Sequence, residues 1–230
     1  MLTFIEILQA VGAFMIGLAG RTALFLVGAV ILVIPAAIIA VGINAVRARR
    51  ERSLARVGNV TYREGAYFAP NHTWLAPTSA GDVDVGIDEV AKKIIPSSTS
   101  VEVAAPGTSV RKGETVAVVY AGRHAVPISA PVDGKVTRVN GAIAGNPALV
   151  REESYGRGWL FTLAPADNGY LRFPAGYEAA GWLGEEKARL ARFVERELGI
   201  AAADGGDLRA PLPSALGEKG WRKVVTSFLG

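Results

Sequence analysis

A run of 25 uncharged residues near the start of the chain constrains its fold more than any other feature. The run extends from Thr22 to Val46 and contains no Asp, Glu, Lys or Arg. A helix of this length measures about 37 Å, which exceeds the roughly 30 Å hydrocarbon core of a bilayer. A long helix in a soluble core would present a polar face, and this run has none. The sequence therefore predicts a transmembrane helix over residues 21–46.

The basic residues around this run predict its orientation. A cluster of five arginines follows it at once: Arg47, Arg49, Arg50, Arg52 and Arg56. Only Arg21 precedes it. The positive-inside rule then places the C-terminal part of the chain in the cytoplasm and the N-terminus outside, in a bacterial inner (cytoplasmic) membrane crossed once. We expect residues 47–66 to form a basic juxtamembrane linker and the arginine cluster to contact anionic lipid headgroups.

The first 20 residues are apolar but are interrupted by Glu6 and Gln9. Two arrangements remain open for them. A second span would bury Glu6 at a cost of a few kcal/mol and would need a hairpin through Gly20 and Arg21. A helix lying at the outer membrane interface avoids that cost. We expect the interfacial helix over residues 1–20.

The charge distribution and the rare residues exclude several kinds of site. The net charge of +4 comes entirely from residues 1–56, so the rest of the chain offers no basic face for a nucleic acid. The absence of cysteine excludes thiolate metal sites and cysteine nucleophiles, and two histidines argue against a multi-histidine metal site. No phosphate-binding loop, dinucleotide fingerprint or nucleophile elbow is present. We therefore expect no catalytic residue, metal or cofactor.

From Tyr67 onward, short alternating segments with turn residues between them predict a β-rich domain. Strands are expected over 100–103, 115–119 and 135–140. Asp88 is a suitable N-cap for a short helix that buries Val90, Ala91 and Ile94. The expected fold class is α+β, with a transmembrane helix before a β-rich domain and short helices beside it.

Six motifs in this region follow one another in order. They are NHTWL (71–75), VGIDEVA (85–91), APGTSVRKGE (105–114), ISAPVDGKV (128–136), NPALV (146–150) and SYGRGWL (154–160). Together they make residues 67–166 resemble the H-protein of the glycine cleavage system, a lipoyl-domain relative. The resemblance implies a hammerhead-like β fold. It also implies that His72, in the His-x-Trp motif, has a structural role.

One position departs from the family pattern. H-proteins carry lipoate on a lysine at a hairpin tip, within a Glu-Ser-Val-Lys-Ala pattern. The corresponding residues here are Tyr120, Ala121, Gly122, Arg123 and His124. Because a guanidinium stays charged and is not acylated, the resemblance implies the fold without the carrier function. Tyr120, Arg123 and His124 are instead expected to contact a membrane or a partner, with a solvated tip as the alternative.

A helical extension is predicted over 167–198, with its helix over 184–198. Residues 199–220 are rich in Gly, Ala and Pro and are expected to be extended. A short apolar stripe then ends the chain: Trp221, Val224, Val225 and Phe228. This stripe suits docking on a partner, on a membrane or on the chain's own domain. We take Trp221 and Phe228 as membrane or partner contacts.

These features favour a non-catalytic, membrane-anchored subunit of a larger integral-membrane complex, with the H-like domain capping its cytoplasmic face. The layout of one span, a basic junction and a β-rich domain is similar to that of the H subunit of bacterial photosynthetic reaction centres. This suggests a photosynthetic or respiratory complex. The alternative is a membrane-tethered adaptor that docks soluble lipoate-dependent enzymes without being lipoylated. The partners expected are other integral-membrane subunits and anionic lipids, with no nucleic acid.

Overall fold

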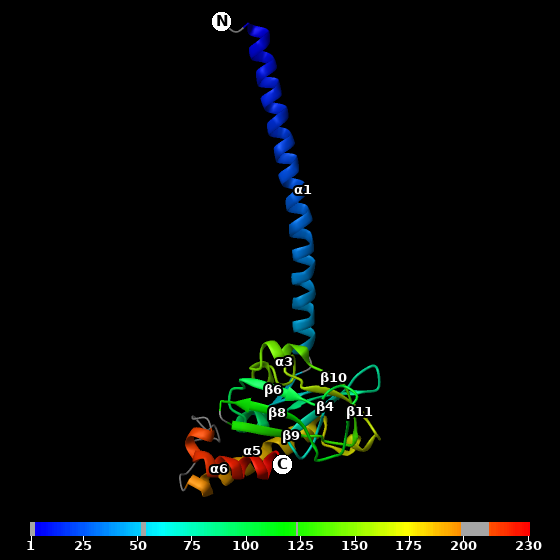
Figure 1. Cartoon of the computed structure of the whole chain (residues 1–230), viewed down its shortest axis with the longest axis vertical. Coiled ribbons are helices and arrows are strands. Elements are labelled where there is room, and N and C mark those ends of the chain that lie inside the picture. The colour runs from blue at the N-terminus through cyan, green and yellow to red at the C-terminus, as the bar shows by residue number, and fades with distance from the viewer. Residues whose placement is uncertain (1–2, 52–53, 123, 199–211) are drawn as a thin grey trace. The chain divides into compact units, whose positions relative to one another are not determined.

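The computed structural model describes residues 3–51, 54–122, 124–198 and 212–230 (Figure 1). The chain divides into two compact units, Met1–Arg52 and Ser53–Gly230. The first unit is one long helix. The second holds all the strands described and the remaining helices.

Helix α1 (Phe4–Glu51) is continuous over 48 residues. Within its Phe4–Gly42 segment, the most apolar window of 18 residues has a mean hydropathy of 3.0 and no buried residue, so the helix is long and apolar enough to cross a membrane. The helix starts with a capping arrangement, because the carboxylate of Glu6 accepts hydrogen bonds from the backbone N–H and the hydroxyl of Thr3 at 2.7 and 3.0 Å. Glu6 thus has a local role at the helix end.

The structure differs from the predicted division of the N-terminal region. Helix α1 has no break at Gly20 and Arg21, because a single glycine costs only about 1 kcal/mol in a helix and the flanking residues are good helix formers. The expected linker over 47–66 is also wrong. Its first residues continue α1, and its later residues form a hairpin of β1 (Leu54–Val57) and β2 (Val60–Arg63).

The strands of the second unit pair in antiparallel fashion throughout the described residues. The six-stranded sheet has the order β3-β4-β5-β11-β10-β7. Its strands are β3 (Tyr67–Phe68), β4 (Thr73–Pro77), β5 (Val83–Ile87), β7 (Ser109–Val110), β10 (Gly134–Val139) and β11 (Phe161–Pro165). The three-stranded sheet has the order β6-β8-β9, with β6 (Ser100–Val103), β8 (Thr115–Ala121) and β9 (His124–Ser129). The strands predicted from alternation are confirmed, with small shifts at their ends.

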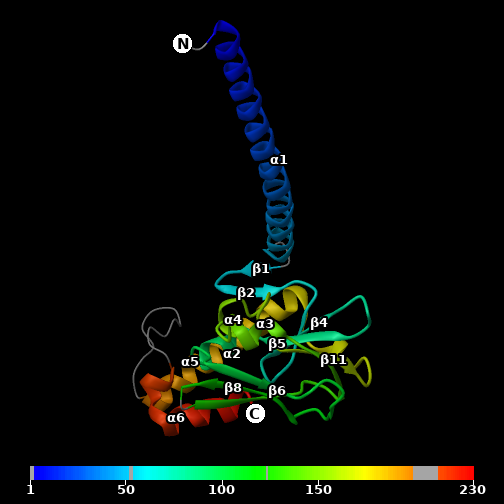
Figure 2. The same cartoon turned by 45° about the horizontal axis from the view of Figure 1, so that its top comes forward.

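The helices of this unit are short, apart from the last two. They are α2 (Glu89–Ile94), α3 (Gly141–Gly145), α4 (Leu149–Glu152), the 3₁₀ helix η1 (Gly169–Arg172), α5 (Gly176–Leu198) and α6 (Leu212–Phe228). Helices α2, α5 and α6 contact one another (Figure 2). Helix α5 starts eight residues before the predicted Gly184. Helix α6 starts at Leu212 and is kinked at Gly217, which has a φ of 64° and a ψ of 173°, so the expectation of extended chain is wrong for most of 212–220.

The core explains the Val-Gly-Ile motif. Trp74 is fully buried, and its indole N–H donates to the carbonyl of Ser154 at 3.1 Å. Gly86 lies opposite Trp74 across the β4–β5 pair. A Cβ atom at Gly86 would lie 2.5 Å from the indole ring, a separation that carbon atoms do not tolerate. The glycine is therefore required by the neighbouring tryptophan.

Candidate functional site: a hairpin tip and a buried histidine

The β8–β9 hairpin ends in a tight two-residue turn. Ala121 pairs with His124, which leaves positions 122 and 123 as the loop. Such turns need positive φ values, and Gly122 has a φ of 60°. Arg123 lies outside the described residues.

Tyr120 faces its neighbour across the sheet. Its hydroxyl donates a hydrogen bond to Glu102 Oε2 at 3.0 Å, between paired strands β8 and β6. This hydrogen bond, together with slight desolvation and the charge of Glu102, raises the pKa of Tyr120 above its usual value. A contact of Tyr120 with a membrane or partner stays a prediction.

His124 is not the free contact residue that the sequence predicted. Its ring centroid lies 4.5 Å from that of Trp221, and its Nδ1 lies 3.2 Å from Glu218 Oε2. Both partners belong to α6. Only 14% of the His124 side chain is exposed, because α6 covers this flank of the hairpin. Gly122, at the end of the turn, remains exposed.

Trp221 and Phe228 are likewise buried within their own domain, with 2% exposure each. The indole N–H of Trp221 donates to the carbonyl of Ile94, the last residue of α2, at 3.2 Å. The predicted contact of these two residues with a membrane or partner is therefore wrong. The apolar side chains of the α6 stripe are all buried against other parts of the same domain.

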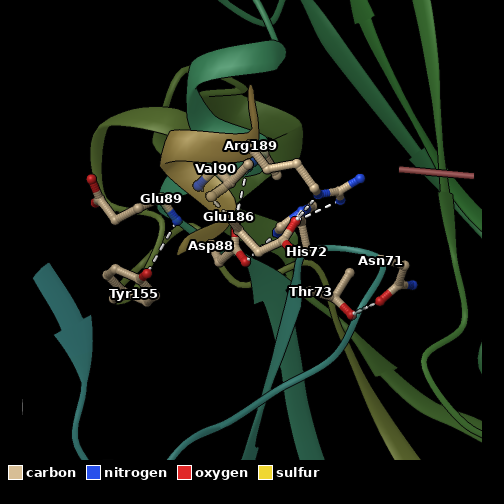
Figure 3. A network of polar contacts seen from close by, with 10 residues as sticks. Asn71, His72, Thr73, Asp88, Glu89, Val90, Tyr155, Glu186 and Arg189 are labelled. Atoms are coloured by element: carbon tan, nitrogen blue, oxygen red, sulfur yellow. Dashed lines mark hydrogen bonds and ion pairs between the residues drawn. The ribbon is translucent and has the colours of Figure 1, made fainter. Parts of the chain in front are cut away.

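His72 lies at the centre of a buried polar network (Figure 3). It is fully buried, and its Nδ1 lies 2.9 Å from Asp88 Oδ2. Its Nε2 lies 3.3 Å from Oε2 of Glu186 on α5, whose carboxylate also pairs with Arg189. Asp88 additionally caps α2, because its Oδ1 accepts from Val90 N–H and Ala91 N–H at 2.8 and 2.9 Å. The predicted N-cap and the structural role of His72 agree with this geometry.

Two aromatic rings enclose the imidazole of His72. Trp182 of α5 and Phe228 of α6 stack on it at centroid distances of 5.4 and 5.9 Å. The guanidinium of Arg189 lies over the ring of Phe228, 4.0 Å from its centroid. His72 also has a φ of 58°, which is uncommon for a residue other than glycine. The two C-terminal helices thus meet the β-rich domain at this residue.

The electrostatics favour a charged imidazole. Burial alone lowers the pKa of His72, but the charge and hydrogen bond of Asp88, together with Glu186, outweigh it and raise the pKa to about 9. The polar contact with His72 lowers the pKa of Glu186 to about 2, against a smaller opposing effect of burial and with help from Arg189. The His72–Asp88 pair at the centre of the network is therefore an ion pair with no exposed side-chain surface, an arrangement that suits fold stability.

The arginine cluster is only partly described. Arg47, Arg49 and Arg50 lie in the last turns of α1, and Arg52 lies outside the described residues. Arg56 lies in β1, and its Nε donates to the carbonyl of Gly58 at 3.1 Å. Contacts of the cluster with anionic lipids stay a prediction.

Other parts of the described chain offer little chemistry. Residues with known placement contain no group of three or more His, Asp or Glu side chains able to hold a metal ion. An open groove of about 440 Å³ lies between α5 and α6, and its lining includes Glu197 and Lys223, which pair with each other at 2.7 Å. The groove lining includes the hydroxyl groups of Thr226 and Ser227 but no histidine that could act as a base for them.

Sequence reasoning missed the link between the two C-terminal helices and the histidine. Glu186 and Phe228 lie more than 100 residues from His72, and no local pattern indicates a pairing over such a distance. The one indication in the sequence was the apolar stripe that contains Trp221 and Phe228. Such a stripe is compatible with packing on the chain's own domain as well as with binding to a partner or a membrane.

Comparisons with known proteins agree with the motif pattern. Residues 66–172 match the family model described as "Glycine cleavage H-protein". A glycine cleavage system H protein of Halorhodospira halophila is 38% identical over 104 residues, which cover 45% of this chain and 80% of the relative. One from Thermus thermophilus is 41% identical over 106 residues, covering 46% and 81%. The crystal structure of a glycine cleavage system H protein from Mycobacterium marinum is also similar, with 28% sequence identity and a TM-score of 0.46. The aligned part covers 54% of this chain and 99% of that protein.

Proposed function

The chain belongs to the glycine cleavage H-protein family, and from that premise we propose that it is a membrane-anchored, non-lipoylated member that serves as a structural subunit of an integral-membrane complex. In this proposal α1 anchors the chain, and the H-like domain caps the cytoplasmic face of the complex. The domain performs no catalysis of its own.

The observation that carries the proposal is the residue at the tip of the hairpin. Arg123 stands where the family pattern has its lysine, and His124 follows in place of alanine. An amide bond to lipoate needs an amine that can lose its proton, and an arginine side chain does not supply one at neutral pH. The contact of His124 with α6 adds support, because a tip held by a helix is poorly suited to a swinging arm.

The anchor rests on α1. Within its Phe4–Gly42 segment, the most apolar window of 18 residues has a mean hydropathy of 3.0 and no buried residue. Exposing so much apolar surface to water would be costly, and a bilayer together with neighbouring membrane helices would remove that cost. The arginine cluster at the end of this helix would lie among cytoplasmic headgroups.

The mass of the native protein tests the non-carrier part of the proposal. We expect the purified chain to have the mass of its unmodified sequence, while an Arg123→Lys variant, expressed with a lipoate ligase, serves as the control for acylation at this tip. A lipoyl increment on the native chain, located on any lysine, would refute the non-carrier assignment.

Co-purification tests the subunit role. The native protein, extracted in mild detergent and separated on a native gel, should migrate with other integral-membrane proteins that mass spectrometry identifies. The alternative adaptor is favoured by one observation, that the match covers about four fifths of the length of the H-protein relatives. Migration with soluble lipoate-dependent enzymes would support that adaptor and reject the subunit role.

A further inference from the structure

The C-terminal helix α6 is an addition to the family domain. The family match ends at residue 172, and α6 begins at Leu212. Only a fifth of the Halorhodospira relative lies outside its match, which is too little chain to reach as far as α6. A surface that α6 covers here must therefore be covered differently, or be open, in such relatives.

The surface that α6 covers includes one flank of the β8–β9 hairpin. Trp221 lies against the ring of His124 and donates a hydrogen bond to the end of α2. Glu218, one turn earlier on α6, approaches His124 Nδ1 at 3.2 Å. Further along, Phe228 stacks on His72. The helix thus bridges the hairpin, α2 and the buried histidine along a single line of contacts.

The residue that makes the hairpin contact is one of those that depart from the family pattern. His124 occupies the position of the alanine in Glu-Ser-Val-Lys-Ala, and a methyl group there would reach neither Trp221 nor Glu218 as the imidazole does. The loss of the lysine at 123 and the gain of a docking side chain at 124 therefore occur at adjacent positions. One change removes the attachment point, and the other holds a new helix beside it.

We propose that the β8–β9 hairpin is the docking site of the chain's own α6, and that α6 is a built-in occupant which a partner must displace before it binds this flank. The inference rests on the proposed non-carrier function and adds an autoinhibitory contact to it. The occupant is residues 212–230 of the same chain, held by His124, by the end of α2 and by His72.

Hydrogen–deuterium exchange on the full chain in detergent micelles tests the docking contact. His124→Ala restores the family residue and should raise amide exchange in 218–229 at least tenfold, while exchange in strand β8 stays unchanged. Tyr120→Phe is the matched control, since it removes a hydrogen bond on the same hairpin that is made to Glu102 instead of α6. Unchanged exchange of α6 in His124→Ala would overturn the proposal.

A peptide tests the displaceable occupant. A fluorescent peptide of residues 212–230 should bind a full chain that carries Trp221→Ala at least tenfold more tightly than the unaltered chain. A peptide that itself carries Trp221→Ala should not bind. Binding to neither chain, or equally to both, would overturn the proposal. If circular dichroism shows that Trp221→Ala unfolds the domain, Glu218→Gln weakens the same contact while keeping the buried indole.

These measurements use no membrane partner. A failure of co-purification would reject the subunit role and leave the exchange and peptide results standing. Conversely, an α6 that is indifferent to His124 would reject the docking contact and leave the subunit role untouched.

Discussion

At the scale of single residues, His72 is the buried side chain that connects helix α2 to helix α5 through polar contacts. It joins Asp88 of the α2 cap to Glu186 of α5 and lies between two aromatic rings. Removing a partner from a buried ion pair leaves an uncompensated charge, which costs far more than a surface pair would. We therefore expect the pH dependence of stability to report on this residue.

The folded-state pKa of His72, about 9, lies above its ordinary value of 6.5. The native state thus holds the proton more tightly, and the resulting stabilisation, roughly 3 kcal/mol, is complete below pH 6.5 and is lost as the pH rises through 9. Urea unfolding of the full chain in micelles, followed by tryptophan fluorescence from pH 6 to 10, should show this loss. In the His72→Gln variant, the free energy of unfolding should depend much less on pH over this range. An equal pH dependence in that variant would contradict the assignment of the effect to His72.

Glu186 has the opposite effect on the pH dependence of stability, at acidic pH. Its pKa in the folded state, about 2, lies below its ordinary value of 4.5, so its stabilisation is present above pH 4.5 and is lost as the pH falls through 2. Together the two residues predict maximal stability of the network between pH 4.5 and 6.5.

Gly86 is the residue whose replacement has the clearest steric outcome. An alanine there places its Cβ within the indole of Trp74, and overpacking of this kind costs about 1–3 kcal/mol. Gly181, in the second turn of α5, is the matched control, because a Cβ atom added there would meet open space. Gly181→Ala should leave stability unchanged or raise it by up to about 1 kcal/mol. Equal unfolding midpoints for the two variants would contradict the steric explanation.

At the scale of elements, the sequence was most informative where the determinants are local. The cap at Asp88, the alternating strands β6 and β8, and the Gly86–Trp74 motif depend on neighbours within a few residues or on one strand pair. Helix α6 was underestimated because its docking depends on His124, Ile94 and His72, which are far away in the chain. An apolar stripe indicates that a helix is covered, but not what covers it.

Helix α2 offers a test that separates capping from charge. Asp88→Asn keeps an oxygen that accepts from Val90 N–H and Ala91 N–H, yet it removes the charge beside His72. Asp88→Ala removes both. We expect Asp88→Asn to lower the pKa of His72 in an NMR titration and to destabilise the domain less than Asp88→Ala, by about 1 kcal/mol for the lost cap. If both variants unfold at the same urea concentration, the capping contribution is negligible.

At the scale of the whole molecule, the two units follow from different patterns in the sequence. The apolar run predicted a transmembrane helix over residues 21–46, and the structure has a helix there that is long and apolar enough to cross a membrane, although it continues without a break through Gly20 and Arg21 to Phe4. The motifs predicted the β-rich domain, and the family match covers it. The sequence places the membrane boundary by its charges alone, so the topology needs a direct measurement.

The absence of cysteine makes that measurement simple, because a single introduced thiol is the only one in the chain. The arginine cluster follows the apolar run, so we expect the N-terminus outside and the β-rich domain in the cytoplasm. In intact cells, a membrane-impermeant maleimide should label Thr3→Cys but label Tyr177→Cys, whose native side chain is 81% exposed, only after permeabilisation. The unaltered chain should stay unlabelled. The reverse pattern would invert the topology, and labelling of both positions in intact cells would place the domain outside, away from the cytoplasmic face that the subunit proposal requires.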